Sequence, residues 1–197
     1  MSYNKHILLL ALQQYSDFKE ADFPAFLDLF ETFTLRKNEY FYRAGEIPKY
    51  SPFIVKGCMQ KFFNNDEGEE QTIYFAEEGW FAGEVQCMRT RTKTNMYLRA
   101  LEDCELLGIT IENSDHAMQA FPEYRRFFDL RYPIEHNRLI QESIRLRSET
   151  PENLYLWLLN DRPSLIQRVP QHLIANYLGI RTETLSRIRK KISGHSS

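Results

Sequence analysis

The chain has 197 residues, of which 43% are hydrophobic and 26% charged, and its formal net charge is −2. These values are ordinary for a globular protein of one large or two small domains, and no apolar run approaches the ~18 residues of a membrane span. The segment MSYNKHILLLAL also lacks the long apolar region and the cleavage site of a signal peptide, so we expect a cytoplasmic protein that does not enter membranes.

Residues 5–32 predict one or two amphipathic helices, because apolar side chains recur there between polar ones. From Phe33 to about Ile111 the pattern changes to short runs rich in aromatic and β-branched residues, separated by turn signals. Such runs are typical of an antiparallel barrel or sandwich. The apolar positions of the helical segment include Leu9, Leu12, Phe23, Phe26, Leu27 and Phe30.

The acidic run NNDEGEE predicts a hairpin turn with Gly68 at the bend, because it lacks the regularly spaced oxygen ligands of a calcium loop, which spans ~12 residues. The cysteines Cys58, Cys87 and Cys104 are odd in number and widely separated, which fits neither a disulfide framework nor a zinc or iron–sulfur site. We expect buried thiols, no metal and no cofactor. Redox sensing by one cysteine is an alternative that no other sequence feature supports.

A long helix is predicted from Pro122 to about Glu149. Its apolar face can pair with a copy in a second subunit, or it can pack on its own domain. Pro133 removes a helical hydrogen bond and is expected to kink or split the helix. The face consists of Phe127, Leu130, Ile134 and Ile144, with the polar residues Asn137 and Gln141 between them.

The segment VPQHLIANYLGIRTETLSRIRKKI, residues 169–192, predicts two short helices joined by a tight turn. Pro170 suits a helix start, Gly179 can adopt the positive φ that ends a helix, and Thr182 can cap the next helix. Ala175 leaves room for a second helix to approach. The apolar residues of the first helix that recur at helical spacing are Leu173, Ile174, Tyr177 and Leu178.

The second helix of this segment has two distinct faces. Leu185, Ile188 and Ile192 are three and four residues apart and predict one buried stripe. Two apolar-faced helices with a basic outer side are the layout of a helix-turn-helix that reads the DNA major groove. The outer face carries Glu183, Ser186, Arg187 and Lys190.

The modest net charge hides an asymmetry. From Arg162 to the C-terminus there are seven basic residues and one acidic residue, a net charge of +6, so the rest of the chain carries −8. The positive charge is therefore concentrated where phosphates would lie against a helix-turn-helix. This distribution predicts double-stranded DNA as a partner.

An antiparallel β-domain, a long helix and a C-terminal helix-turn-helix, in this order, resemble the Crp/Fnr family of bacterial transcription regulators. The resemblance covers nearly the whole chain. It rests on the order and spacing of several short motifs that precede the helix-turn-helix block IANYLGIRTETLSRIRKKI. These motifs are Ala44-Gly45-Glu46, Lys56-Gly57, Glu78-Gly79 and Phe81-Ala82-Gly83-Glu84.

The resemblance implies an α+β fold with a jelly-roll-like antiparallel β-roll as sensor domain. The expected division is a sensor with N-terminal helices over residues 1–121, a dimerisation helix over 122–150 and a helix-turn-helix domain over 151–197. The family implies a homodimer that binds near-palindromic operator DNA under the control of a small-molecule effector, with RNA polymerase as a further candidate partner. The hairpins of the family's winged helix look trimmed, because only PSLIQR separates the helix predicted at Leu154–Asn160 from Val169.

The recognition helix matches the Glu-x-x-Ser-Arg arrangement of Fnr-like members at Glu183, Ser186 and Arg187, which we expect to read bases. A carboxylate can accept from a cytosine amino group, and a guanidinium can donate twice to guanine. Other polar side chains of this region are expected to contact phosphates and set the register. These are Arg181, Thr182, Thr184 and Lys190.

The sensor half departs from the cyclic-AMP pattern. The resemblance places an effector pocket at Gly83, Glu84, Thr94 and Asn95. Glu84 matches the family's ribose contact, but the phosphate-binding Arg-Ser or Arg-Thr pair is replaced by uncharged Thr94 and Asn95. We therefore expect an unidentified effector other than cyclic AMP. As an alternative, a shifted loop can supply the positive charge through Arg89, Arg91 and Lys93. On the long helix, the positions that correspond to the family's purine-contacting hydroxyls are the apolar residues Leu139 and Ile140.

No nucleophile–base pair, metal-ligand spacing or phosphate loop indicates catalysis, so we do not expect an enzyme. The leading hypothesis is a dimeric DNA-binding transcription regulator. The alternative is a ligand-binding or protein-interaction module whose helix-turn-helix does not bind DNA, and the basic outer face of the second helix argues against it.

Overall fold

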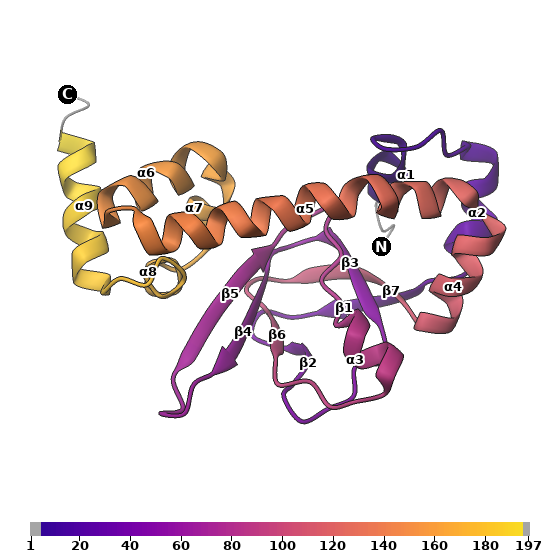
Figure 1. Ribbon diagram of the computed structural model, residues 1–197, viewed down its shortest axis with the longest axis horizontal. Coiled ribbons are helices and arrows are strands. Elements are labelled where there is room, and N and C mark those ends of the chain that lie inside the picture. Colours follow the sequence, from indigo (N-terminus) through magenta and orange to yellow (C-terminus); the bar gives the residue numbers. More distant parts are fainter. Residues whose placement is uncertain (1–4, 195–197) are drawn as a thin grey trace.

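Two antiparallel sheets form the centre of the computed structural model, which describes residues 5–194 (Figure 1). Strands distant in sequence are neighbours in both sheets, as in a jelly roll, and the predicted antiparallel β-domain is confirmed. One sheet has the strand order β1 (Glu31–Leu35), β7 (Cys104–Ile109), β3 (Ser51–Lys56). The other has the order β2 (Tyr40–Tyr42), β6 (Tyr97–Ala100), β4 (Met59–Asn64), β5 (Glu70–Ala76).

The two sheets enclose an apolar core because inward-facing side chains alternate along their strands. Ile54 on β3, Leu98 on β6 and Leu106 on β7 are fully buried in one cluster between the sheets. A short helix that the sequence did not predict, α3 (Val85–Thr90), interrupts the strand-rich region between β5 and β6. It follows Glu84 directly and therefore fixes the path of the chain at the expected effector pocket.

The β4–β5 hairpin has the acidic turn that the sequence predicts. The Asn65 side chain accepts hydrogen bonds from the backbone N–H groups of Glu67 and Glu69, at 3.1 and 2.8 Å. Gly68 has a φ of +80°, a conformation that residues with a side chain rarely adopt. In Figure 1 the tip of this hairpin extends away from the sheets on the same side of the molecule as the C-terminal helices.

Helices from both ends of the β-domain cover the sheet formed by β1, β7 and β3. The N-terminal elements are α1 (His6–Gln13), the 3-10 turn η1 (Glu20–Asp22) and α2 (Phe23–Leu27), and the later ones are α4 (Ile111–Ala120) and the first turns of α5 (Pro122–Ser148). The helices predicted within residues 5–32 are thus confirmed, although the last residues of this range already begin β1. They share one core that includes Leu8, Leu12, Phe26, Phe53, Tyr124 and Phe127.

The long helix α5 has 27 residues and continues through Pro133, so the expectation of a split helix is wrong. Proline removes only one helical hydrogen bond, and Pro133 lies on the exposed side of α5, where water can reach the backbone. An ion pair one turn apart, from Arg131 to Glu135 at 3.6 Å, spans Pro133. No described helix is both long and apolar enough to cross a membrane.

The structure divides the predicted apolar face of α5 between two environments. Phe127 is fully buried against the chain's own β-domain, whereas Leu130, Ile134 and Ile144 are 45%, 54% and 51% exposed. Asn137 and Gln141, which lie between the exposed residues along the helix, are exposed too. The exposed stripe at spacings of three and four therefore begins at Leu130 and excludes Phe127.

Four helices form the C-terminal part: α6 (Pro151–Asp161), α7 (Pro163–Arg168), α8 (Gln171–Tyr177) and α9 (Thr182–Gly194). The segment PSLIQR, which leaves no room for a wing hairpin, is helix α7, and no strand occurs in the described residues after Ile109. These helices share a core with the β-domain, because Phe75 and Leu101 belong to the same buried cluster as Leu158, Ile174 and Leu185. Figure 1 shows α9 at the outer end of the molecule.

Candidate DNA-binding surface and effector pocket

The turn between α8 and α9 has the geometry of a helix-turn-helix. Gly179 has a φ of +67°, which ends α8, and a Cβ atom there would meet no atom within 4 Å. Glycine is thus required by the backbone conformation rather than by crowding. The Ile180 N–H then donates to the Ala175 carbonyl at 3.0 Å, which closes the turn.

The start of α9 differs from the expectation by one residue. The Leu185 N–H donates to the Arg181 carbonyl at 3.1 Å, and α9 begins at Thr182. Arg181 therefore occupies the cap position, and Thr182 is the first helical residue, so the predicted cap at Thr182 is wrong. This shift leaves the side chains of Arg181 and Thr182 exposed at the outer end of the turn.

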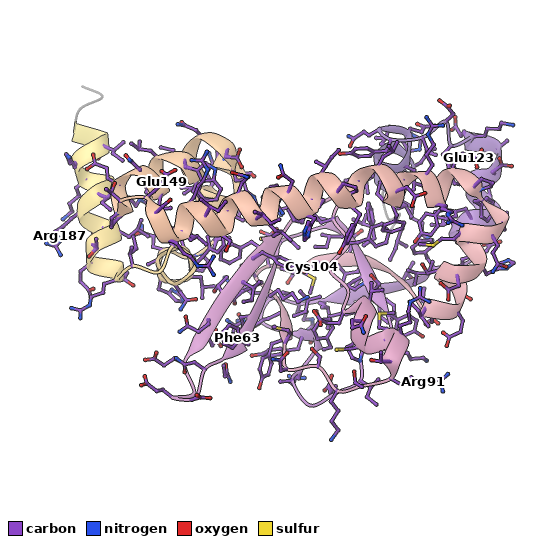
Figure 2. All side chains as sticks on the ribbon, viewed as in Figure 1. Phe63, Arg91, Cys104, Glu123, Glu149 and Arg187 are labelled. Atoms are coloured by element: carbon purple, nitrogen blue, oxygen red, sulfur yellow. The ribbon has the colours of Figure 1, made fainter. Side chains whose placement is uncertain are left out.

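The predicted base-reading residues lie on one outer side of α9. Leu185 is fully buried and Ile188 is 9% exposed on the inner side, as the stripe predicted. Glu183 and Arg187 are exposed, and Ser186, half-buried, lies between them along the helix. In Figure 2 the Arg187 side chain points away from the rest of the molecule, and its one described hydrogen bond is a long one, 3.4 Å, from Nε to the Glu183 carbonyl.

The predicted phosphate contacts surround these residues. Arg181, Thr182 and Lys190 are exposed and Thr184 is half-buried. Ser186 and Lys190 line a cleft of about 410 Å³ between α6 and α9. The arrangement presents cations around a short polar helix face, which can enter a DNA major groove while its flanks contact phosphates.

The first helix of the helix-turn-helix packs on the edge strand of the sensor sheet. The Asn176 side chain accepts a hydrogen bond from the Thr72 backbone N–H at 2.8 Å and donates one to the Glu70 carbonyl at 2.7 Å. It therefore pairs with β5 as a neighbouring strand would. The rings of Phe75 on β5 and Tyr177 on α8 meet edge to face, with centroids 5.5 Å apart.

Two arginines join α7 and its flanking residue to the sensor domain. Arg162 donates to Glu77 at 2.6 Å and to the Phe75 carbonyl at 2.9 Å, and Arg168 donates to both carboxylate oxygens of Glu78 at 2.8 and 2.9 Å. Arg168 also contacts Glu102. We call these contacts the arginine clamp. The clamp was not predicted, although the dipeptide Glu77-Glu78 directly after a strand and the basic C-terminal segment were signals for it.

Charge pairing in the arginine clamp is reflected in its pKa values. Burial opposes ionisation of Glu78, but hydrogen bonds from Arg168 and from the Gly57 backbone N–H outweigh it and lower the pKa of Glu78. The same carboxylate and Glu102 raise the pKa of Arg168. Glu78 and Arg168 are thus both ionised at neutral pH, and their charged hydrogen bonds help to hold the helix-turn-helix against the sensor.

Gly83 and Glu84, two of the residues predicted for an effector pocket, lie directly before α3. A Cβ atom on Gly83 would lie 2.2 Å from the Ser51 hydroxyl, so the close approach of β3 requires glycine. Glu84 is paired with the Nζ of Lys61 inside the β-roll. Burial opposes the charge of Lys61, but Tyr74 and Glu84 outweigh burial and raise the pKa of Lys61. The acidic group available for a ribose contact is therefore engaged by an internal cation.

Thr94 and Asn95 are not brought to the same cavity. Thr94 is 2% exposed, and its hydroxyl accepts from the Met96 backbone N–H at 3.0 Å, whereas Asn95 is exposed. The nearby cation Arg89 makes a bidentate pair with Asp115 at 2.8 and 3.0 Å. Arg91 lies 3.8 Å from Glu112.

A cavity of about 710 Å³ lies between α5, α3, α4 and the β-domain. Gly83 lines it, and Glu84, Thr94 and Asn95 do not belong to its wall. Its volume is within the range of small-molecule sites, which are mostly apolar with a few polar groups. The wall is largely apolar and aromatic, including Trp80, Phe81, Met118, Phe127, Phe128 and Leu139.

Two of the three cysteines have the buried environment predicted for structural thiols, whereas Cys87 on α3 is half-buried. Cys58 and Cys104 are buried, and burial raises the pKa of both, that of Cys104 to about 12. A thiol with a raised pKa is a poor nucleophile at neutral pH. The described residues contain no group of three or more histidine, cysteine or acidic side chains that could hold a metal ion.

The chain is similar to known proteins both over its central region and over most of its length. Residues 32–120 match the family described as "Cyclic nucleotide-binding domain". The chain is 29% identical over 167 residues to the transcriptional activator protein Anr of Pseudomonas aeruginosa, covering 78% of this chain and 67% of Anr. It is 25% identical over 144 residues to a cyclic nucleotide-gated potassium/sodium channel of Oryctolagus cuniculus, covering 73% of this chain but only 12% of the channel.

The fold is also similar to a solved regulator structure. That protein is CLP of Xanthomonas campestris, described as a c-di-GMP-responsive global regulator. The TM-score is 0.73 at 16% identity, and the similarity covers 90% of this chain and 93% of CLP. The regulators among these relatives are not enzymes. Anr is named a transcriptional activator, and CLP is described as linking cell-cell signaling to virulence gene expression.

Proposed function

We propose that the chain is a cytoplasmic Crp/Fnr-type transcription regulator that binds duplex DNA through α9, which is supported by the match of residues 32–120 to the cyclic nucleotide-binding domain family and by the similarity to Anr. The outer side of α9 carries this proposal: Glu183 and Arg187 are exposed, Ser186 between them is half-buried beside the cleft to α6, and the exposed cations Arg181 and Lys190 flank the three residues along the chain. We assign base reading to these three residues and phosphate contacts to Arg181, Thr182, Thr184 and Lys190.

The regulator acts as a homodimer that binds a near-palindromic operator. The exposed stripe of α5 supports this assembly, because Leu130, Ile134 and Ile144 would otherwise leave apolar surface in water. Polar Asn137 and Gln141 would fix the register between the two copies. In this arrangement residues 1–121 form the sensor, 122–150 the dimerisation helix and 151–197 the DNA-binding domain.

The effector is a small molecule other than cyclic AMP. Neither Thr94 nor Asn95 can supply the positive charge that a cyclic phosphate needs, and Glu84 is already paired with Lys61. Contacts to RNA polymerase fit a regulator of this family and stay part of the proposal.

Salt-dependent binding to duplex DNA tests this function. Two cations per protomer, Arg181 and Lys190, give about four phosphate contacts in a dimer, and log K should fall with log salt at a slope of about −3.6. Raising the salt from about 50 to 200 mM should thus weaken binding roughly 100-fold, as measured by fluorescence anisotropy. Salt-independent or undetectable binding would instead support the alternative, a ligand-binding or protein-interaction module.

A further inference from the structure

The cavity beneath α5 contains one cation with an unused hydrogen-bond donor. Arg138 lines the cavity, and its Nε donates to Glu135 at 3.0 Å while its Nη1 contacts Glu142. Its Nη2 atom is buried and has no hydrogen-bond partner among the described residues. A buried N–H without an acceptor is costly, so this atom is a ready site for an acceptor brought by a ligand.

The surroundings of Arg138 favour an anionic acceptor. Three arginines and two carboxylates line the cavity, and the carboxylate of the wall that pairs with Arg138, that of Glu135, is shared with Arg131 at 3.6 Å. The Arg138 guanidinium lies over the Trp80 ring, 4.3 Å from its centroid, which holds its plane in place and leaves one edge for the ligand. A fixed guanidinium edge suits carboxylate and phosphate groups.

The rest of the cavity favours an apolar ligand body. Phe81, Phe127 and Phe128 form one aromatic group, with centroids 5.0 to 6.3 Å apart, and Met118 completes the wall on the α4 side. Burial raises the pKa of Tyr124 at the floor, so its hydroxyl stays neutral. A small molecule would therefore place its apolar part among these rings and its charged group at Arg138.

We infer that this cavity binds an amphipathic small molecule with an apolar body and one anionic head group, and that Arg138 on α5 holds the head group. This inference rests on the proposed regulatory function and names the effector class. It differs from what the family resemblance implied, because the cation comes from α5 and not from the loop at Thr94 and Asn95. The interior of the β-roll, by contrast, is occupied by the Lys61–Glu84 pair.

The same arginine connects the cavity to the DNA-binding domain. Glu142, 5% exposed, contacts Arg138 through Oε1 and accepts a hydrogen bond from the Tyr177 hydroxyl on α8 at 3.1 Å through Oε2. An anion that draws Arg138 toward the cavity weakens the pairing of Glu142. A buried carboxylate that loses its cation is strongly disfavoured, so Glu142 and Tyr177 rearrange together and move α8.

Isothermal titration calorimetry on the full chain, without DNA, tests the site. The anionic probes are 1-naphthoate and 1-naphthyl phosphate, with 1-naphthol as the body without charge and inorganic phosphate as the charge without a body. We expect at least one anionic probe to bind at least 10-fold more tightly than either control compound. Equal affinity for 1-naphthol, or no binding of both anionic probes, would overturn the inference.

Two variants assign the binding to Arg138. Arg138→Met should lower the affinity for the tighter anionic probe at least 10-fold and leave 1-naphthol unchanged. Arg138→Lys keeps a charge beside Glu142 but removes the planar guanidinium; it should lower the anion affinity several-fold with the thermal unfolding midpoint of wild type. Arg126→Met, at an exposed position outside the cavity wall, is the matched control. Unchanged anion affinity in a folded Arg138→Lys protein would contradict the assignment.

The link to DNA is measured separately. Saturating anionic probe should change the DNA affinity of wild type, and Tyr177→Phe should reduce that change at least 3-fold while the probe affinity stays the same. An equal change in both proteins would refute the connection through Tyr177. Because calorimetry uses no DNA, probe binding without DNA binding would count against the proposed function alone, and DNA binding without probe binding against the effector site alone.

Discussion

In the proposed DNA-binding surface, Arg187 is the side chain that we expect to contribute most to specificity. It is exposed, points away from the molecule and makes one described hydrogen bond, a long one to its own helix. Its other donors are therefore available to a base edge. A guanidinium can donate two hydrogen bonds to guanine, which distinguishes guanine from the other bases. Glu183, one turn earlier on the same side, adds an acceptor for a cytosine amino group.

Arg187→Ala should weaken binding to the preferred duplex by about 1–3 kcal/mol and relax the preference at one base position per half-site. Fluorescence anisotropy with the preferred duplex and with single-base variants measures both effects. Arg126→Ala, which removes the same charge from an exposed position on α5, should leave the affinity nearly unchanged. An equal loss of affinity in the two variants would mean that Arg187 contributes only its positive charge and does not read a base.

Thr94 and Asn95 underlie the prediction for cyclic AMP. In the proposed pocket they take the positions of the phosphate-binding pair but carry no charge, and the Thr94 hydroxyl accepts a hydrogen bond from the Met96 backbone N–H. Cyclic AMP should therefore show no micromolar binding by calorimetry, since a buried phosphate without a cation is disfavoured. A micromolar dissociation constant would mean that another cation reaches the pocket.

Helix α5 carries both the exposed stripe proposed for dimerisation and part of the cavity wall, on different faces. Its inner face bears Tyr124, Phe127, Arg131 and Arg138, and its exposed stripe bears Leu130, Ile134 and Ile144. A change on the stripe can thus be made without touching the cavity.

Ile134→Lys places a charge in the stripe and should weaken dimerisation by roughly 100-fold, or about 2.7 kcal/mol, because two unpaired ammonium groups would be buried at the interface. Sedimentation equilibrium of the variant and of wild type measures this loss. His136→Lys, also exposed on α5, is the control and should sediment as wild type does. A monomeric wild-type protein, or an unchanged Ile134→Lys dimer, would place the subunit interface elsewhere.

The arginine clamp makes stability depend on pH. The pKa of Glu78 is lowered in the folded state, so its contribution is present above the ordinary carboxyl pKa and is lost as the pH falls through the lowered value. Glu78→Gln should cost about 1–3 kcal/mol at pH 7, and it should flatten the loss of stability between about pH 5 and pH 3. Urea unfolding across this range gives both quantities.

Glu67→Gln at the tip of the β4–β5 hairpin is a matched control, because the Glu67 side chain is exposed and only its backbone N–H contributes to the turn. Its unfolding curve should follow wild type at every pH. If Glu78→Gln did the same, the clamp would not contribute to the stability of the docked helix-turn-helix.

Local patterns made some elements predictable and left others hidden. The turn at Gly179, the buried stripe of Leu185 and Ile188 and the hairpin at Gly68 follow from backbone preference and periodicity, which are properties of neighbouring residues. The Lys61–Glu84 pair joins residues on separate elements. In the arginine clamp, Arg162 and Glu77 are 85 positions apart in the sequence, Arg168 and Glu78 are 90 apart, and Arg168 and Glu102 are 66 apart. Such contacts depend on tertiary packing, which one sequence does not reveal.

In the whole molecule, an acidic body with a net charge of −8 carries a basic end with +6. The arginine clamp, Asn176 and the Phe75–Tyr177 contact fix that end to the sensor sheet, and Glu142 links it to the cavity through Arg138. The division into charge regions was predictable from the sequence. The orientation of the basic end was not, because it depends on contacts between domains.

Selection of bound sequences from random duplex DNA with the purified full chain tests the central claim most directly. A dimer that reads DNA through two copies of α9 should enrich a near-palindromic motif whose half-sites lie about one helical turn, roughly 10–10.5 base pairs, apart from centre to centre. The Arg187→Ala protein should lose the preference at one symmetric pair of positions. Recovery of no enriched sequence, or of a motif that Arg187→Ala leaves intact, would contradict DNA reading by α9.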